Sequence, residues 1–594
     1  MKFCIYTHFN ALGEVPSYVI FFLNEIKKNG FNTLVVVNGL LTIDGRKKLE
    51  LVCDTVLTRE NEGYDFSAWK FGLEYLKANF SSKIQEIILT NNSFYGPLFN
   101  LDAIFNNKKL IEADFWGITE YKSPGKDIRD HIQSYFLLFH EKIINSFEFH
   151  QYWQNLKPPK TMEEAIELET NFTHYFTSRG FSSCVAFPNE LFGLRKDSDY
   201  SCFSPLKLIQ SGCPFLKRKI FTKLGTVFFE KGCTTLPYDC INEIKKTSNY
   251  DENLIFEDLI KSVPPSRLKE IYLLDLFTCN TFVKRIKNFS VALVHFAFYE
   301  DLIGKTISFI NSFESSDRII IVSPNQKILD LYRVKLEANF SNLEFRLQEN
   351  RGRNEAAWFL TCKDILSTVD YVCLTHDKKM SHEPQLLGEK SFEMTFENCL
   401  SSKTHVNQIL NFFFENPRVG LLVPPFPQVA AWKDLYSWIW GKNGTLCHTV
   451  LKNLIRNYCW DPKPICPIGS VFWARKGSLR KLLEFKIQDF PEEPLPRDGT
   501  LLHALERLYP NIAQHEGYTT GWVLSPRGAK TYIEELGSNL HTLQTQEGHL
   551  NLKSIPNSLL LRQLISRRPF LRILLLPFYK LYKKIIKSHP LKKG

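Results

Sequence analysis

The sequence predicts an α/β fold, with strands of a mainly parallel sheet alternating with helices, and predicts it twice along the chain. Short apolar runs such as TLVVVN (33–38) and RIIIVS (318–323) alternate with segments of helical spacing. A motif also recurs, and its flanking segments follow in the same order. We therefore expect one domain over residues 1–187, a helical connecting region over 188–287, a second domain over 288–540 and a basic tail over 541–594.

The repeated motif reads RENEGYDFSAW (59–69) in the first half and QENRGRNEAAW (348–358) in the second. Glycine, asparagine and aspartate at a helix start are typical of a capped turn. Two copies after two strands favour an anion or nucleotide site instead, because helix N-termini offer unpaired N–H groups. We expect both motifs to lie in like surroundings facing a hollow, with nucleotide-sugar contacts from Arg59, Asn61, Gly63, Asp65, Asn350, Gly352 and Asn354.

The flanks of the motif support a duplication. Upstream, IYTHFN (5–10) is similar to LVHFAF (293–298), and downstream EIILTNNS (86–93) is similar to YVCLTHDKK (371–379). Further on, SYFLLF (134–139) pairs with SVFWAR (470–475), and ELETNFTHYF (167–176) pairs loosely with RDGTLLHAL (497–505). Polar residues follow the buried strands at the edge where ligands of parallel sheets bind.

Charge is concentrated at the end of the chain. The net charge is +11, and residues 548–594 hold eleven Lys and Arg with no Asp or Glu. Residues 555–594 place these charges among leucines, which is typical of a helix lying on an anionic membrane surface. Nucleic-acid binding fits less well, because leucines have no use on a phosphate backbone. A C-terminal helix packed on the core is the remaining alternative.

The remaining composition indicates a cytoplasmic protein on the inner face of a membrane. The fourteen cysteines include no CxxC pair, so neither a zinc ribbon nor a disulfide framework is indicated. The N-terminus has no secretory pattern, and no apolar run reaches the ~18 residues of a membrane span.

Several blocks resemble the rhamnan synthesis F family: RENEGYDFSAWKFGL, ILTNNSFYGPL, DFWGITE, HIQSYFLLF and GCPFLKRKIF, then VHFAFYEDL, THDKKMSHE, GSVFWARKGSL and DGTLLHALERL. The resemblance covers about residues 3–525. It implies transfer of rhamnose from dTDP-rhamnose to a growing lipid-linked polysaccharide. The halves look like two tandem GT-A-like (Rossmann-like) domains. A transferase using another nucleotide-sugar, or a scaffold with inactive sites, remains an alternative.

Within such a fold, the second half offers the more complete acidic set. Asp377 and His376 stand where a divalent cation, Mg²⁺ or Mn²⁺, would bind, and Lys378 or Lys379 could neutralise diphosphate charge. Asp498 stands where a general base for an inverting transfer is expected. A helix N-cap is an equally good and compatible interpretation of Asp498.

The first half departs from this pattern, because Asn91, Asn92 and Ser93 replace an acidic motif. Asn92 could ligate a cation through its carbonyl, although carboxylates are usual, and Asp114 is an alternative ligand. Glu169, or less well Glu167, is the candidate base, with a solvated helix carboxylate as the alternative. The cluster Lys217–Lys219 is interpreted as a solvated helix face, with phosphate contact as the alternative.

Overall fold

The computed structural model describes residues 1–80, 84–123, 129–192, 199–379, 385–428, 439–455, 457–496 and 498–548. The chain divides into two compact units. The larger contains residues 1–425 and 438–526 and holds two sheets of seven and eight strands. The smaller contains residues 426–437 and 527–594, and its described part is mainly the long helix α25 (Pro526–Gly548). The predicted tail, 541–594, is described only as far as residue 548, so its proposed membrane-binding part, 555–594, lies outside the described residues.

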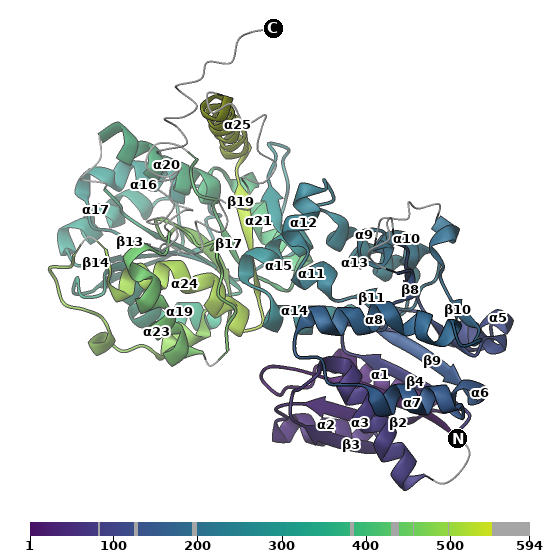
Figure 1. Ribbon diagram of the computed structural model, residues 1–594. Helices are drawn as coiled ribbons and strands as arrows, with labels where there is room; N and C mark the ends of the chain where they lie inside the picture. Colours follow the sequence, from purple (N-terminus) through teal and green to yellow (C-terminus); the bar gives the residue numbers. More distant parts are fainter. Residues whose placement is uncertain are drawn as a thin grey trace, which may run out of the picture. The chain divides into compact units, whose positions relative to one another are not determined.

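The first sheet has the order β10-β6-β9-β4-β1-β2-β3, in which β9 alone is antiparallel to its neighbours (Figure 1). Its strands are regular because residues of β1 alternate between two apolar layers, Phe3 and Ile5 on one face and Cys4 and Tyr6 on the other. The elements of this half are β1 (Lys2–His8), α1 (Ser17–Lys28), β2 (Asn32–Asn38), α2 (Ile43–Val52), β3 (Thr55–Arg59), α3 (Tyr64–Asn79), β4 (Glu86–Asn91), β5 (Phe94–Tyr95), α4 (Asp102–Phe105), α5 (Lys108–Glu112), β6 (Phe115–Gly117), β7 (Glu120–Tyr121), β8 (His131–Ile132), β9 (Phe136–His140), α6 (Glu141–Ile144), α7 (Phe147–Asn155), α8 (Met162–Thr177) and β10 (Ser183–Val185).

The second sheet has the order β12-β19-β17-β18-β16-β13-β14-β15, and here β18 is the antiparallel strand. If strands are numbered from the one that opens each half, both sheets run 3-2-1-4-6-5-7 with strand 6 reversed, and β12 is an additional edge strand of the second sheet. The elements of this half are β13 (Val291–Phe296), η2 (Glu300–Leu302), α16 (Ile303–Ile310), β14 (Arg318–Ser323), α17 (Gln326–Leu336), β15 (Asn342–Leu347), α18 (Arg353–Ala356), η3 (Ala357–Thr361), α19 (Lys363–Thr368), β16 (Tyr371–His376), α20 (Gln385–Leu400), α21 (Lys403–Glu415), β17 (Val419–Val423), η5 (Gly441–Asn443), α23 (Gly444–Leu454), β18 (Phe472–Arg475), η6 (Arg480–Glu484), η7 (Ile487–Asp489), α24 (Leu501–His515) and β19 (Thr519–Leu524).

Each sheet is covered on both faces, as expected for strands that are apolar throughout. In the first half, α3, α7 and α8 cover one face, whereas α1 and the connecting helices cover the other. In the second half, α23 and α24 cover one face, and α16, α17, α20 and α21 cover the other. The connecting region therefore supplies part of the core on one face of the first sheet.

The connecting region is mainly helical but supplies a strand to each half. Its elements are η1 (Asn189–Phe192), α9 (Tyr200–Phe203), α10 (Pro205–Gln210), β11 (Leu216–Lys217), α11 (Lys219–Thr222), α12 (Gly225–Glu230), α13 (Leu236–Thr247), α14 (Asn253–Ser262), α15 (Pro265–Tyr272) and β12 (Asp275–Phe277). Strand β11 pairs with β5, and β12 joins the second sheet beside β19. The cluster Lys217–Lys219 was predicted to be a helix face, and this was wrong for Lys217, which lies in β11.

Candidate functional site

The two repeated motifs share the turn that opens the helix, although the first continues as the α-helix α3 and the second passes from α18 into the π-helical η3. Gly63 and Gly352 each cap a helix in the left-handed conformation, with φ of 69° and 74°. The tryptophans that end the motifs, Trp69 and Trp358, are both fully buried. The two asparagines differ in exposure, however: Asn61 is exposed, whereas Asn350 is half-buried and its Oδ1 has no partner among the described residues. The expectation of like surroundings is met by the backbone and not by these side chains.

Among the other predicted residues of the motifs, Arg59 and Asp65 are hydrogen-bonded within the protein and Asn354 is buried. Arg59 ends β3 and donates from its guanidinium to Asn38 Oδ1 at 2.7 Å. Asp65 accepts a hydrogen bond of 2.8 Å from the side-chain amide of Asn91. Burial raises the pKa of Asp65 to about 6, although the Asn91 amide acts in the opposite direction. In the second half, Asn354 replaces this aspartate and is buried.

Asp377, the predicted metal ligand, forms hydrogen bonds to the segment that follows β13. Its side chain has no exposed surface, and its Oδ2 accepts hydrogen bonds from the backbone N–H groups of Phe298 (2.8 Å) and Tyr299 (2.9 Å). Its Oδ1 lies 3.3 Å from Nε2 of His295. Burial alone would raise the pKa of Asp377, but His295 and the two N–H groups lower it. The carboxylate is ionised. Its Oδ2 faces two donors, whereas its Oδ1 has no hydrogen-bond partner among the described residues.

The other predicted metal ligands also bond within the protein, but Asn92 does so through its amide nitrogen and not through the carbonyl oxygen that would ligate a cation. His376 bonds through Nε2 to the carbonyl oxygen of Gly469 at 2.8 Å, and burial lowers its pKa to about 4. Asn92 donates from its amide to the Phe9 carbonyl at 2.8 Å. Asp114 lies at the amino end of β6, where it accepts hydrogen bonds from Ser182 and Lys142. That end is opposite the carboxyl edge of the sheet. The described residues hold no group of three or more His, Cys, Asp or Glu side chains that could bind a metal ion.

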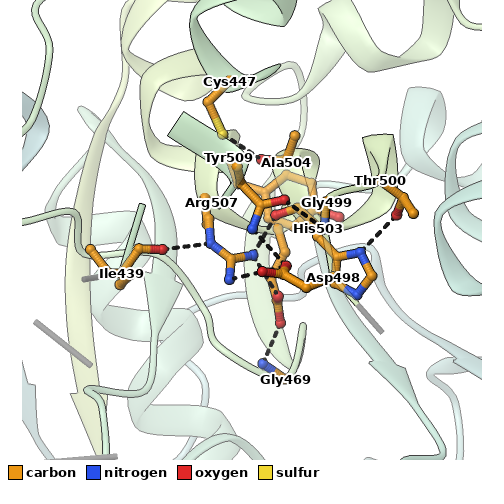
Figure 2. A network of polar contacts seen from close by, with 12 residues as sticks. Ile439, Cys447, Gly469, Asp498, Gly499, Thr500, His503, Ala504, Arg507 and Tyr509 are labelled. Atoms are coloured by element: carbon orange, nitrogen blue, oxygen red, sulfur yellow. Dashed lines mark hydrogen bonds and ion pairs between the residues drawn. The ribbon is translucent and has the colours of Figure 1, made fainter. Parts of the chain in front are cut away.

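Asp498 lies just before α24 among polar groups that keep it ionised. Its Oδ1 accepts a hydrogen bond of 2.6 Å from the side-chain amide of Asn443 and lies 3.9 Å from the guanidinium of Arg507. Partial burial raises the pKa of Asp498, but Asn443, the Gly499 N–H and Arg507 lower it by more. Its side chain remains 37% exposed. Figure 2 shows Arg507 directed both at this carboxylate and at the Ile439 carbonyl.

Glu506, in the second turn of α24, is a site residue that the sequence comparison did not single out. Its Oε1 accepts the N–H of Gly469 at 2.6 Å and lies 3.9 Å from Nζ of Lys378. Burial raises the pKa of Glu506, but the charges of Lys378 and Arg507 lower it by more. Lys378, which was predicted to neutralise diphosphate charge, is therefore brought to the same cluster as Asp498 by way of Glu506 and Arg507.

Glu169 is the counterpart of Glu506 in the first half. Its Oε1 accepts the N–H of Ser134 at 2.7 Å and the hydroxyl of Ser134 at 2.8 Å. Ser134 and Gly469 occupy the same place relative to the register of strands 4 and 6. Leu137, three residues after Ser134, faces Leu89, and Phe472, three residues after Gly469, faces Leu374, which aligns with Leu89. The loose pairing of 167–176 with 497–505 missed this correspondence. The sequence signal that could have revealed it is the glutamate inside each of the two helices, Glu169 in α8 and Glu506 in α24.

The predicted site residues therefore form two groups within the larger unit. In the second half, Lys378 and Asp498 lie in one cluster with Glu506 and Arg507, while Asp377 points into the core beside His295. In the first half, Asp65 and Glu169 lie close enough for the charge of Glu169 to raise the pKa of Asp65. Glu167 is exposed on α8.

The cluster in the second half can do acid–base chemistry beside an anion. It combines an ionised, partly exposed carboxylate with the cations of Lys378 and Arg507.

No helix in the described part of the chain combines the length and the apolar character needed to cross a bilayer.

Proteins of similar sequence cover parts of this chain. An uncharacterised protein, WxcX, of Xanthomonas campestris pv. campestris (strain B100) is 26% identical over 232 residues, which are 39% of this chain and 32% of WxcX. The virulence protein VirA of Vibrio anguillarum (strain ATCC 68554 / 775) is 27% identical over 204 residues, which are 33% of this chain and 60% of VirA. The chain thus spans less than two thirds of the length of these curated relatives.

Among solved structures, the glycosyltransferase GlyE of Streptococcus pneumoniae TIGR4 is 12% identical, with a TM-score of 0.22 over 67% of this chain and 88% of that chain. This score is too low to support an inference about fold or activity. The family match is far broader, since the model described as rhamnan synthesis protein F matches residues 33–518. The resemblance predicted from the sequence is confirmed: the chain belongs to the rhamnan synthesis protein F family.

Proposed function

We propose that the chain is a glycosyltransferase of bacterial polysaccharide synthesis. In this proposal it transfers rhamnose from dTDP-rhamnose to a lipid-linked glycan with inversion, and each half is a GT-A-like domain. Family membership supports the rhamnose donor and the polysaccharide product. The shared strand order 3-2-1-4-6-5-7 supports two related donor-binding folds.

The observation that carries the proposal is the position of Asp498. Its carboxylate is ionised and partly exposed, and it lies in one cluster with Arg507, Glu506 and Lys378. An acceptor hydroxyl that donates to this carboxylate becomes a better nucleophile. Its oxygen then forms a bond to the anomeric carbon as the bond from that carbon to the diphosphate breaks. Asp498 keeps the proton, and the electron pair leaves with dTDP.

The first half is proposed to bind rather than to catalyse. Asp498 lies eight residues before Glu506, and the residue at the same distance before Glu169 is Thr161. Thr161 caps α8 by accepting the Glu164 N–H at 3.3 Å. The first half thus has the counterpart of Glu506 and lacks that of Asp498. This difference favours one catalytic half and one half that binds a nucleotide-sugar or glycan.

The test is incubation of the full chain with a membrane acceptor and a panel of donors, comparing wild type with Asp498→Asn, Glu169→Gln and the double variant. We expect rhamnose transfer from dTDP-rhamnose by wild type, loss of transfer in Asp498→Asn, and residual transfer in Glu169→Gln. Transfer from another donor alone would replace rhamnose in the proposal. Full activity of Asp498→Asn would reject the assignment of the base.

A further inference from the structure

We propose that the first half binds the diphosphate of a nucleotide-sugar through the ammonium group of Lys217, supplied by the connecting region, in place of a divalent cation. The inference rests on the proposed function in one respect, namely that the ligand is a nucleoside diphosphate. It concerns a site in the half to which catalysis is not assigned.

Lys217 lies at the carboxyl edge of the first sheet, although it is distant in sequence from that sheet. Strand β11 pairs with β5, which places Lys217 opposite Phe94. The next residue, Arg218, donates its N–H to the carbonyl of Ser93 at 2.8 Å. Ser93 ends the polar segment that follows β4, at the edge where ligands of parallel sheets bind. The connecting region thus delivers a cation directly beside the segment that lacks carboxylates.

The two basic neighbours of Lys217 have carboxylate partners of their own. Arg218 forms a two-point ion pair with Asp258, with N–O distances of 2.6 and 2.9 Å. Lys219 pairs with Asp199 at 2.8 Å. Lys217 has no ion pair or hydrogen bond in the described part of the chain, and its Nζ lies 3.7 Å from the ring centre of Tyr135. A half-buried ammonium without a hydrogen-bonded anion is costly unless a ligand provides one.

The acidic groups near Lys217 are already occupied. Glu169 accepts two hydrogen bonds from Ser134, and Asp65 accepts one from Asn91. Burial lowers the pKa of Lys217 and the charge of Lys219 lowers it further, whereas the charges of Asp199 and Glu169 favour its protonated form. These carboxylates therefore support the charge without forming its ion pair. A diphosphate would supply the missing acceptors.

The second half shows why the first half needs this lysine. In the aligned segments LTNNS and LTHDK, Ser93 stands where the second half has Lys378. Lys378 reaches the cluster around Glu506, the counterpart of Glu169, at 3.9 Å. The first half has no lysine of its own at that place. Instead Nζ of Lys217, from another segment, lies 3.7 Å from the ring centre of Tyr135, the neighbour of the Ser134 that bonds Glu169. Both halves therefore present an ammonium group near the same glutamate.

The test is calorimetric titration of the full chain in EDTA with dTDP and, separately, with inorganic pyrophosphate. Variants are Lys217→Gln, the charge-keeping Lys217→Arg, and the control Lys223→Gln, which alters an exposed lysine nearby. We expect Lys217→Gln to weaken one binding site roughly 10- to 100-fold for both probes. Lys217→Arg and Lys223→Gln should bind within a few fold of wild type, and Mg²⁺ should not tighten that site.

Two results would overturn the inference: unchanged binding by Lys217→Gln, or wild-type binding that requires Mg²⁺ at every site. A melting curve separates lost binding from lost folding, and Lys217→Arg repeats the test in a variant that keeps the charge. Rhamnose transfer without an effect of Lys217→Gln on binding would reject the inference and leave the proposed function standing. Pyrophosphate binding that depends on Lys217, without any transfer, would do the opposite.

Discussion

Asp498 and Glu506 belong to one cluster, but their surroundings suit different tasks. The Asp498 side chain is 37% exposed, whereas that of Glu506 is 12% exposed and holds the Gly469 N–H at 2.6 Å. A base must meet the acceptor hydroxyl, so exposure favours Asp498. Glu506 instead fixes the segment before β18 and offsets the charges of Lys378 and Arg507.

Substituting these two carboxylates should therefore separate activity from stability. We expect Asp498→Asn to lower kcat by about 10²- to 10⁴-fold with little change in Tm. Glu506→Gln should lower the free energy of unfolding by about 1–3 kcal/mol, because it weakens the acceptor of a buried N–H and removes a counter-charge. Asp44→Asn, on the exposed surface of α2, is the control. If Glu506→Gln loses turnover at full stability while Asp498→Asn stays active, Glu506 is the base and Asp498 has the structural role.

Glu355 gives a second prediction, on pH dependence. Burial raises its pKa to about 8, its Oε2 has no partner in the described chain, and Tyr509 donates to its Oε1 at 3.4 Å. Below pH 4.5 the folded and unfolded forms both hold this proton. Between pH 4.5 and 8 the unfolded chain loses it and the folded chain keeps it, so the stability contributed by this group falls as pH rises.

Glu355→Gln should remove this dependence. Relative to wild type, we expect the variant to gain about 2–4 kcal/mol of unfolding free energy on going from pH 4.5 to pH 8. Denaturant unfolding at both pH values measures the difference. An equal difference between variant and wild type at the two pH values would show that Glu355 ionises normally.

At the scale of elements, the turn that opens the helix after strand 3 of each half is shaped by a glycine. Gly352 has a φ of 74°, and a Cβ there would lie 2.7 Å from Cβ of Ala356 and 2.9 Å from Cγ of Phe490. Gly517 has a φ of 89° but open space around it. Alanine at either position should cost about 1–2 kcal/mol of backbone strain, and Gly352→Ala should cost about 1–3 kcal/mol more through overpacking. Unfolding midpoints of the two variants measure this, and equal losses would exclude the steric cause.

This turn was predictable from sequence, whereas the direction of Asp377 was not. The motif E-N-x-G places a glycine between strand and helix, and local chain geometry requires it there. Asp377 follows β16 as predicted, but its side chain turns to the N–H groups of Phe298 and Tyr299, which follow β13, a strand distant in sequence. Only the register of β13 against β16 brings those donors within reach.

Asp377→Asn should therefore be a stability variant. Replacing one oxygen by an amide removes the charge facing His295 and sets donor against donor, with an expected loss of about 2–4 kcal/mol. The exposed Asp301→Asn, which breaks a surface ion pair with Lys379, should cost less than about 1 kcal/mol. Unfolding is measured with EDTA and with Mg²⁺. Stabilisation of wild type by Mg²⁺ that Asp377→Asn abolishes would restore the metal role.

At the scale of the whole molecule, the connecting region contributes to both halves, which are far apart in the sequence. It covers one face of the first sheet, adds β11 beside β5, and adds β12 beside β19. The common order of the corresponding segments was visible in the sequence, and the two sheets share the strand order 3-2-1-4-6-5-7. The place of Lys217 beside Glu169 was not visible, because a two-residue antiparallel pairing decides it and leaves no periodic signal.

The prediction for the whole chain concerns residues 555–594, which carry most of the net charge of +11. We expect the full chain to sediment with phosphatidylglycerol vesicles at low salt and less with phosphatidylcholine vesicles, because each Lys or Arg near an anionic surface contributes about 1 kcal/mol. Deleting these residues leaves α25 intact and should abolish sedimentation. Replacing Arg567, Arg568, Lys583 and Lys584 by glutamine keeps the leucines and should weaken binding in step with the charge removed. A truncated chain that sediments as well as the full chain would place membrane attachment elsewhere.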